Sequence, residues 1–503
     1  MSYYKVYWRS FLLFLLLTIL SSCESEVDVE ISNPVITSFS LRSLDGEAEH
    51  VCSIQGDTIT AFFPESDNSF CVPTIEGDFD YVEYNSEKVV MGVTVVDFNN
   101  TCQFDCVKGT GEKTKRHSYT AIIQTQNGIP RIDIVTEGGA KIESKDEYVN
   151  GTITIGNDPE FGYYQGELEI RGRGNYTWTD YPKKPYKIKL KEKISIHGMP
   201  ENKDWVLLAD YTDRSLMRTA CMAEVSKIVG LPYTIHYSFV DLYINNEYLG
   251  TYYLTDQVEK GKSRVDITDN GYLIEDDKYY KNEPLFFTST TNQFNYTFKY
   301  PKKLTVDDER YLWIQSYIND FEASLFSSDE SKFLEYIDID TFAKWFIIEE
   351  LLGNYDSNVY YVLSDRDHKM QMYPVWDAEW SLGLAYLKDG AWQAPEFGSP
   401  VDVEIWSNRL YFTELMKKQG FIDSLKANWK EVSGKLSDIP QRIDEIASTI
   451  SLSQKDNFDK WQTMGKFVRV EVVVHDTWEE ELEYLKSFYN QRLSYMNAYI
   501  NNL

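Results

Sequence analysis

The stretch GNYDSNVYYVLSDRDHKMQMYPVWDAEWSLG, residues 353–383, organises the interpretation of the chain. Its centre predicts a β-hairpin, in which residues 358–363 are rich in Val and Tyr, SDRDH is a polar turn, and residues 369–375 form the returning arm. Because a strand rises about 3.3 Å per residue, two arms of similar length bring their outer ends together. Asp356 and Asp377 flank the hairpin, so we expect their carboxylates to lie side by side.

Such a pair of carboxylates has two interpretations. In metal-assisted chemistry, one Asp binds a hard cation and the other orients or deprotonates a nucleophile. Asp residues at hairpin ends also act as turn caps. The remainder of the chain has to distinguish the two.

Composition limits the classes of partner. The chain has 503 residues, enough for two or three domains, and it carries 79 acidic against 50 basic residues, a formal charge of -29. This balance argues against nucleic-acid binding, which depends on a basic surface. It does not exclude a nucleotide, which needs only a few local cations.

The N-terminus predicts export and lipid anchoring. Lys5 and Arg9 precede an apolar run of ten residues, 11–20, which is too short to cross a bilayer and suits a signal peptide over residues 1–22. The run ends in LSSC, which resembles a bacterial lipobox and predicts cleavage before Cys23 and lipidation of that residue. The acidic residues that follow resemble the surface-export signal of Bacteroidetes-type lipoproteins. We therefore expect an outer-membrane lipoprotein of the cell envelope, held to the membrane by Cys23 and exposed at the cell surface.

Residues 33–127 follow a short tether, 23–32, and predict a small all-β sandwich. Short alternating strands are separated by Asp, Asn and Gly turns, and the opening NPVITSFSL resembles immunoglobulin-like modules of surface lipoproteins. Four cysteines lie in this segment, and outside the cytoplasm they have three disulfide pairings open to them: Cys52, Cys71, Cys102 and Cys106. No group in this domain points to chemistry, so we interpret it as a spacer or docking module.

Residues 128–503 predict an α+β domain whose C-terminal part is helical. LEIRGRGNYTW, residues 168–178, is a strand that enters a Gly-rich turn, and KKPYKIKL, residues 183–190, is a strand with Lys187 and Lys189 on one face. A Gly-rich loop followed by a strand lysine is similar to the phosphate-binding arrangement of protein kinases. A tight turn and a solvated strand face are the alternative. We expect Asp213 to be the N-cap of a helix over residues 215–228. Glu224 on that helix is expected to be an exposed acid, and the alternative is a pair with a phosphate-binding lysine, as in protein kinases. Further helices are expected at 340–352, 408–419, 422–436, 439–452 and 477–500.

Taken together, these blocks resemble the CotH kinase family, named for spore-coat protein H. The resemblance runs from about residue 128 to the C-terminus and rests on the order of the motifs IRGRGNYTW, KKPYKIKL, GMP, DWVLLA, DRSLMR, GTYYL, GNYDS and PVWDAE. It implies an atypical protein-kinase-like fold and an exported kinase that uses ATP with Mg²⁺ or Mn²⁺ to phosphorylate protein hydroxyls.

The resemblance also implies roles for residues. Asp356 matches the catalytic Asp and Asp377 the metal-binding Asp, with Asn358 and Glu379 as further metal ligands. The phosphate contacts would come from Arg171, Arg173, Lys187 and Lys189. Three features depart from the family pattern: Glu379 stands where Asp is usual, Thr255-Asp256 replaces a usual Glu, and the insertion after Asp356 is shorter than is common in the family.

A non-catalytic interpretation stands beside the kinase. In that alternative, the domain is a recognition scaffold on the cell surface that binds a glycan or a host protein. The sequence does not identify the acceptor residue, the oligomeric state or the disulfide pairing, and it leaves AMP transfer open beside phosphoryl transfer.

Overall fold

The computed structural model describes residues 31–44, 49–64, 70–98, 101–126, 129–158, 162–329, 331–394 and 398–503. The expected signal peptide, Cys23 and most of the tether lie outside these residues. The chain is a mixed α+β protein that divides into two compact units, the first extending to Ile123 apart from the end of strand β4. In the part of the chain that the structure describes, no helix combines the length and the apolar character that crossing a bilayer requires.

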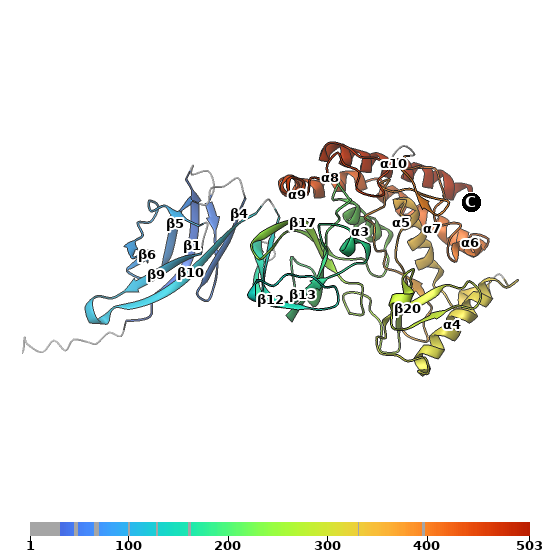
Figure 1. The fold of residues 1–503 in the computed structure, drawn as a ribbon, viewed down its shortest axis with the longest axis horizontal. Coiled ribbons are helices and arrows are strands. Elements are labelled where there is room, and N and C mark those ends of the chain that lie inside the picture. The colour runs from blue at the N-terminus through green and yellow to red at the C-terminus, as the bar shows by residue number, and fades with distance from the viewer. Residues whose placement is uncertain are drawn as a thin grey trace, which may run out of the picture. The chain divides into compact units, whose positions relative to one another are not determined.

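The first unit consists of two β-sheets whose inner faces form its core (Figure 1). Phe39 on one sheet and Phe104 on the other meet edge to face at 5.2 Å, and both rings are fully buried. The all-β character was expected, whereas the immunoglobulin-like assignment stays a prediction. The four cysteines of this unit that the structure describes are buried: Cys52, Cys71, Cys102 and Cys106. The strands, in sheet order, are β2 (Glu49–Val51), β1 (Val35–Ser43), β5 (Phe70–Asp78) and β8 (Val96–Asp97), and β3 (Ser53–Gln55), β4 (Thr58–Pro64), β10 (Lys115–Gln126), β9 (Cys102–Lys108), β6 (Tyr81–Tyr84) and β7 (Glu87–Lys88).

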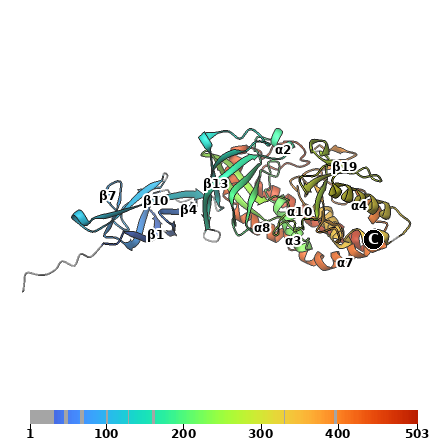
Figure 2. The same ribbon diagram turned by 90° about the horizontal axis from the view of Figure 1, so that it is seen from below.

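The second unit begins with a closed seven-stranded barrel that the sequence did not predict (Figures 1 and 2). Its strands, in order around the barrel, are β11 (Arg131–Thr136), β12 (Val149–Asp158), β13 (Gly162–Gly172), β14 (Tyr186–Ile194), β15 (Asn202–Leu208), β17 (Glu247–Asp256) and β16 (Tyr237–Ile244). The ring closes through β11 and β16, which pair in parallel, while the other neighbours pair antiparallel. Closure leaves the barrel without exposed strand edges.

Alternation along each strand fills the barrel. On β14, Ile188 and Leu190 are buried in the interior, in a cluster that includes Ile170 and Trp205 from the neighbouring strands. The period of two predicted from the sequence is therefore confirmed. It places the lysines between these residues on the outer face.

The rest of the second unit consists of a helical region and a five-stranded sheet with the order β19-β20-β18-β21-β22, which lies to the right of the barrel in Figure 1. These strands are β18 (Tyr272–Asp276), β19 (Phe286–Thr288), β20 (Asn295–Tyr300), β21 (Val359–Leu363) and β22 (Gln371–Met372), and a separate pair is formed by β23 (Leu387–Lys388) and β24 (Ala391–Trp392). The helices are α2 (Tyr176–Thr179), α3 (Arg218–Val229), α4 (Glu309–Leu325), α5 (Ile339–Leu352), α6 (Phe412–Leu415), α7 (Gln419–Leu436), α8 (Ile439–Thr449), α9 (Ser453–Trp461) and α10 (Trp478–Asn502). The helical C-terminal part is confirmed.

Three local predictions were wrong. The helix expected over residues 408–419 is limited to the single turn of α6, and α3 begins at Arg218 instead of residue 215. Glu224 is only 4% exposed, and it forms ion pairs with Lys227 and with Arg442 of α8. Its ion pair with Arg442 links helices α3 and α8, which explains why a charged residue lies on that buried face of α3.

The predicted hairpin is present. Strand β21 pairs antiparallel with β22 in the register Tyr361↔Met372, and it also pairs with β18 on its other side. The second arm is shorter than expected. The hairpin is thus built into the sheet, with Asp356 before its first strand and Asp377 after its second.

Candidate functional site

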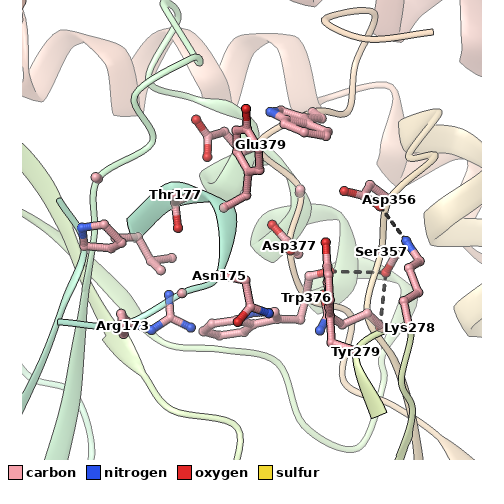
Figure 3. A pocket seen from close by; sticks show the side chains of 18 of the residues that line it. Arg173, Asn175, Thr177, Lys278, Tyr279, Asp356, Ser357, Trp376, Asp377 and Glu379 are labelled. Carbon is pink, nitrogen blue, oxygen red and sulfur yellow. Dashed lines mark hydrogen bonds and ion pairs between the residues drawn. The ribbon is translucent and has the colours of Figure 1, made fainter. Parts of the chain in front are cut away.

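A cavity of about 860 Å³ lies within the second unit, and four segments meet around it (Figure 3). They are the Gly-rich turn after β13, the segment after β15, the turn after β18, and the two ends of the hairpin. Several of the predicted site residues line it: Asp356, Asp377, Asn358, Glu379 and Arg173. Concave sites of this size with converging polar groups are typical of ligand pockets.

The side chain of Asn354 holds the two hairpin ends together. Helix α5 ends at Gly353, whose φ of 63° directs the chain into the site. The next residue, Asn354, donates from Nδ2 to the Asp377 carbonyl at 3.1 Å and accepts from the Asp356 N–H at 3.2 Å. One buried amide therefore fixes the backbone of both acids. The GNYDS motif contained this residue, but no local signal marked its role.

Asp377 differs from the other residues of the site in its backbone conformation and in the surroundings of its carboxylate. Its φ is 69°, in the left-handed region that non-glycine residues seldom adopt. No donor of the described residues hydrogen-bonds to its carboxylate, which faces the cavity (Figure 3). The side chain of Asp377 is exposed to the solvent of the cavity. Desolvation by the cavity walls and the neighbouring charge of Asp356 raise its pKa to about 7, while Arg173 and Lys278 oppose that rise.

Asp356 forms an ion pair with Lys278, whose Nζ lies 2.5 Å from its Oδ1. Lys278 follows strand β18 and precedes Asp356 by 78 residues. It lines the cavity, and its side chain is 63% exposed. The sequence reasoning missed this lysine because only the pairing of β18 with β21 brings it to the site.

Arg173 supplies positive charge on the side of Asp377 that lies away from Asp356 (Figure 3). Its guanidinium lies 5.8 Å from the ring centre of Trp376 and makes no hydrogen bond to the described residues. Burial lowers its pKa, and the carboxylate of Asp377 opposes that shift. The turn requires glycine on both sides of Arg173, because a Cβ at Gly172 or Gly174 would lie 2.4 Å or 2.3 Å from a neighbouring side chain.

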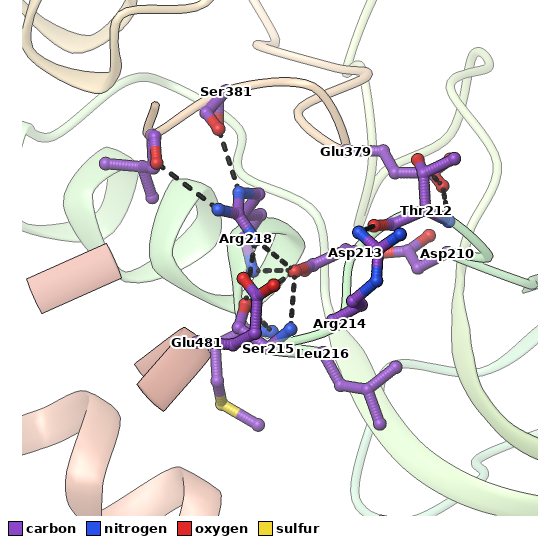
Figure 4. Close-up of polar contacts among 12 residues, drawn as sticks. Asp210, Thr212, Asp213, Arg214, Ser215, Leu216, Arg218, Glu379, Ser381 and Glu481 are labelled. Carbon is purple, nitrogen blue, oxygen red and sulfur yellow. Dashed lines mark hydrogen bonds and ion pairs between the residues drawn. The ribbon is translucent and has the colours of Figure 1, made fainter. Parts of the chain in front are cut away.

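Glu379 and Asn358, the other expected metal ligands, both have protein partners. One oxygen of Glu379 accepts from the backbone N–H and the hydroxyl of Thr212, at 2.7 and 2.5 Å (Figure 4). Burial and the nearby Asp210 raise the pKa of Glu379 to about 8. The Asn358 side chain donates from Nδ2 to Glu275 at 2.5 Å, so its carbonyl oxygen is the atom that could bind a metal ion. In the described ranges, no group of three or more His, Cys, Asp or Glu side chains is arranged to hold a metal ion.

The other predicted phosphate-binding residues lie elsewhere. Arg171 donates to the carbonyls of Lys145 and Gly172, Lys187 forms an ion pair with Asp204 at 2.9 Å, and Lys189 pairs with Glu169 at 3.5 Å. None of the three lines the cavity. They project from the outer face of the barrel, as the alternation of β13 and β14 requires. Of the predicted basic set, the structure brings only Arg173 to the cavity.

The DRSLMR motif stabilises the segment that follows Asp377 (Figure 4). Asp213 and Arg218 form a fully buried ion pair at 2.5 Å, and the Arg218 guanidinium donates to the carbonyls of Ser381 and Leu382. Asp213 also accepts from the N–H groups of Ser215 and Arg218. The prediction that Asp213 is the N-cap of this helix was therefore wrong, because α3 begins later and its N-cap is Met217. The main partner of Asp213 is Arg218, which ties α3 to the segment after Asp377.

The family comparison covers the region that builds this cavity. The model described as CotH kinase protein matches residues 170–496, which include the Gly-rich turn, the hairpin and the C-terminal helices. A search of curated proteins gives no match. Because the matched region spans well over half of the sequence, the chain belongs to the CotH kinase protein family.

Proposed function

We propose that the protein transfers the γ-phosphoryl group of ATP to a protein hydroxyl, in a reaction that depends on Mg²⁺ or Mn²⁺. One observation carries this proposal: an arginine and a carboxylate, Arg173 and Asp377, face the same cavity and neither is hydrogen-bonded by the described residues. Arg173 is half-buried and Asp377 is exposed to the solvent of the cavity, so a ligand that enters the cavity can reach both groups. A phosphate for the guanidinium and a cation for the carboxylate would satisfy both.

The donor set suits a hard divalent cation. Mg²⁺ usually binds one or two carboxylates together with phosphate and water oxygens, so it does not require a cage of protein ligands. Asp377 would provide the first oxygen, and the carbonyl oxygen of Asn358 and the remaining carboxylate oxygen of Glu379 are further candidates. The bound cation would neutralise phosphate charge. This matters here because acidic side chains outnumber basic ones in the lining of the cavity.

The roles of the protein groups follow from their positions. Arg173 donates to a phosphate oxygen, and Asp356 orients the acceptor hydroxyl and accepts its proton. Asn354 keeps the two acids in a fixed relation. Arg171, Lys187 and Lys189 have no part in this site, because their positive ends are on the outer face of the barrel.

Transfer of labelled phosphate tests the proposal. The protein is incubated with ATP labelled at the γ-phosphate and with model peptides containing Ser, Thr or Tyr, in Mg²⁺ and in Mn²⁺. We expect Asp377→Ala and Asp356→Asn to lower incorporation at least about a hundredfold. Asp367→Ala is the matched control, because Asp367 lies in the turn at the far end of the same hairpin and is 83% exposed.

Parallel reactions separate the alternatives. ATP labelled at the α-phosphate reports AMP transfer, which would replace the phosphoryl-transfer assignment. Equal incorporation by the wild type and Asp377→Ala would contradict the proposed site. If the wild type neither transfers phosphate nor binds ATP, the non-catalytic alternative applies, in which the domain binds a glycan or a host protein.

The proposal includes the location of the protein. A lipid on Cys23 anchors the chain to the outer membrane, and the ATP-dependent domain lies in the cell envelope. The leader and lipobox of the sequence support this anchor. Metabolic labelling with a fatty acid should mark the wild type and not Cys23→Ala, and the variant should leave the membrane fraction.

A further inference from the structure

We infer that Lys278 binds the γ-phosphoryl group and, in doing so, releases Asp356 to act on the acceptor. This inference rests on the proposed function and adds a residue that neither the motifs nor the family comparison assigns. The observation behind it is the ion pair between Lys278 and Asp356, at 2.5 Å on the wall of the cavity.

The backbone around Lys278 is fixed, so its position is not that of a loosely held surface lysine. Asp276 at the end of β18 is directly paired with Val359 of β21, three residues after Asp356. The next residue, Asp277, is 9% exposed and accepts from the Tyr279 N–H at 2.7 Å and from the Thr297 hydroxyl at 3.1 Å. These contacts fix the turn that carries Lys278 into the cavity (Figure 3).

Apart from Arg173, the other basic side chains that line the cavity have different partners. Lys299 pairs with Glu275 at 2.6 Å, Lys145 donates to the side chain of Asn175 at 3.1 Å, and Arg469 stacks on the Tyr176 ring at 3.2 Å. Lys278 is thus the lysine of the described cavity lining whose partner is the proposed base. Its ammonium has three protons, and the ion pair with Asp356 occupies one of them.

The chemistry gives this lysine a role at the transferred group. The acceptor oxygen forms a bond to the γ-phosphorus while the bond from that phosphorus to the bridging oxygen breaks, and the bond electrons stay on the β-phosphate of ADP. The acceptor proton moves to Asp356. A lysine beside Asp356 is placed to donate to an equatorial oxygen of the phosphoryl group and to stabilise the charge there. As its donors turn to the phosphate, the carboxylate becomes available to the hydroxyl.

Nucleotide binding tests the inference without requiring turnover. Dissociation constants are measured by calorimetry for Mg²⁺ with a non-hydrolysable ATP analogue and for Mg²⁺ with ADP. Lys278→Met should weaken binding of the ATP analogue about tenfold and leave ADP within about twofold, because the lysine contacts only the group that ADP lacks. Lys278→Arg should recover most of the difference.

Lys281→Met is the matched control. Lys281 lies in the same turn, is exposed, and projects over the Tyr280 ring without lining the cavity. Both nucleotides should bind this variant as they bind the wild type. In the phosphate-transfer assay, Lys278→Met should lower kcat about a hundredfold with a smaller change in the KM for ATP.

The outcomes separate the two proposals. Equal weakening of the ATP analogue and ADP, or no weakening of either, overturns the role of Lys278 and leaves the proposed function standing. A wild type that binds neither nucleotide overturns both. Circular dichroism and the thermal midpoint check that Lys278→Met is folded, as the 63% exposure of the side chain leads us to expect.

Discussion

Replacement of Arg218 by Met should destabilise the second unit and displace the segment that carries Asp377. The guanidinium of Arg218 is fully buried and contacts Asp213 at 2.5 Å, the Ser381 carbonyl at 2.9 Å and the Leu382 carbonyl at 3.4 Å. Met fills a similar volume but leaves a buried carboxylate without its counter-charge. Breaking a buried pair from one side typically costs about 3–5 kcal/mol.

The structure places the cost of the broken ion pair near the lower end of that range. After the replacement, Asp213 still accepts from the N–H of residue 218 and from the N–H and hydroxyl of Ser215. These donors continue to stabilise the charge. The two carbonyls after Asp377 lose their shared donor, at about 1–3 kcal/mol for each group that stays buried without a partner. With about 3 kcal/mol for the pair and about 1 kcal/mol or more for each carbonyl, we therefore expect a loss of at least about 5 kcal/mol.

Urea unfolding followed by tryptophan fluorescence measures this loss, and a double variant provides the sharper comparison. Asp213→Leu combined with Arg218→Met removes both charges, so it should be more stable than Arg218→Met alone by at least about 1 kcal/mol. Binding of Mg²⁺ with ATP should weaken in both variants, since neither retains the contacts to Ser381 and Leu382. A single variant within about 1 kcal/mol of the wild type, or a double variant less stable than the single, would refute the reasoning.

Three further predictions concern the same region. Asn354→Ala should lower kcat at least about tenfold because it frees both hairpin ends, and Asn354→Asp should not restore it, since a carboxylate cannot donate to the Asp377 carbonyl; steady-state kinetics measures both. Burial raises the pKa of Glu349 to about 8, so its contribution to stability is present below its unfolded pKa and is lost as pH rises toward 8; Glu349→Gln should flatten the urea midpoint between pH 5 and pH 8, and an unchanged slope would contradict this. Removal of divalent cations with EDTA should weaken ATP binding at least about tenfold, with recovery on adding Mg²⁺ or Mn²⁺, and metal-independent affinity would argue against Asp377 as a ligand.

The hairpin was predictable because its determinants are local. Alternating Val and Tyr, a polar turn and two arms of similar length fix the pairing, and the pairing then fixes where Asp356 and Asp377 emerge. The barrel was not predictable in the same way. Its closure depends on β17 lying between β15 and β16 and on a parallel contact between β11 and β16. The parallel contact joins segments about a hundred residues apart in the chain, and β15 pairs with a strand about fifty residues later.

At the predicted phosphate-binding residues, the kinase resemblance and the structure differ. The sequence correctly placed Lys187 and Lys189 on one face of a strand, opposite to Ile188. From the kinase resemblance, we expected that face of the strand to contact a nucleotide. In a closed barrel the face opposite the core is the outside, so both lysines pair with surface acids, Asp204 and Glu169. Lys278 occupies the cavity instead, and nothing in its local sequence distinguishes it from other surface lysines.

The contrast between Asp377 and its acidic neighbours supports a ligand site. Glu379 is bound by Thr212, Asp210 by Thr219, and Asp356 by Lys278, whereas no donor of the described residues reaches the Asp377 carboxylate. Asp377 also has a left-handed backbone, which non-glycine residues seldom adopt. Backbone strain persists where the surrounding structure imposes it, and it concentrates at functional sites. Here Asn354 and Arg218 fix the backbone on either side of a carboxylate that is exposed to the cavity, where the proposed cation would bind it.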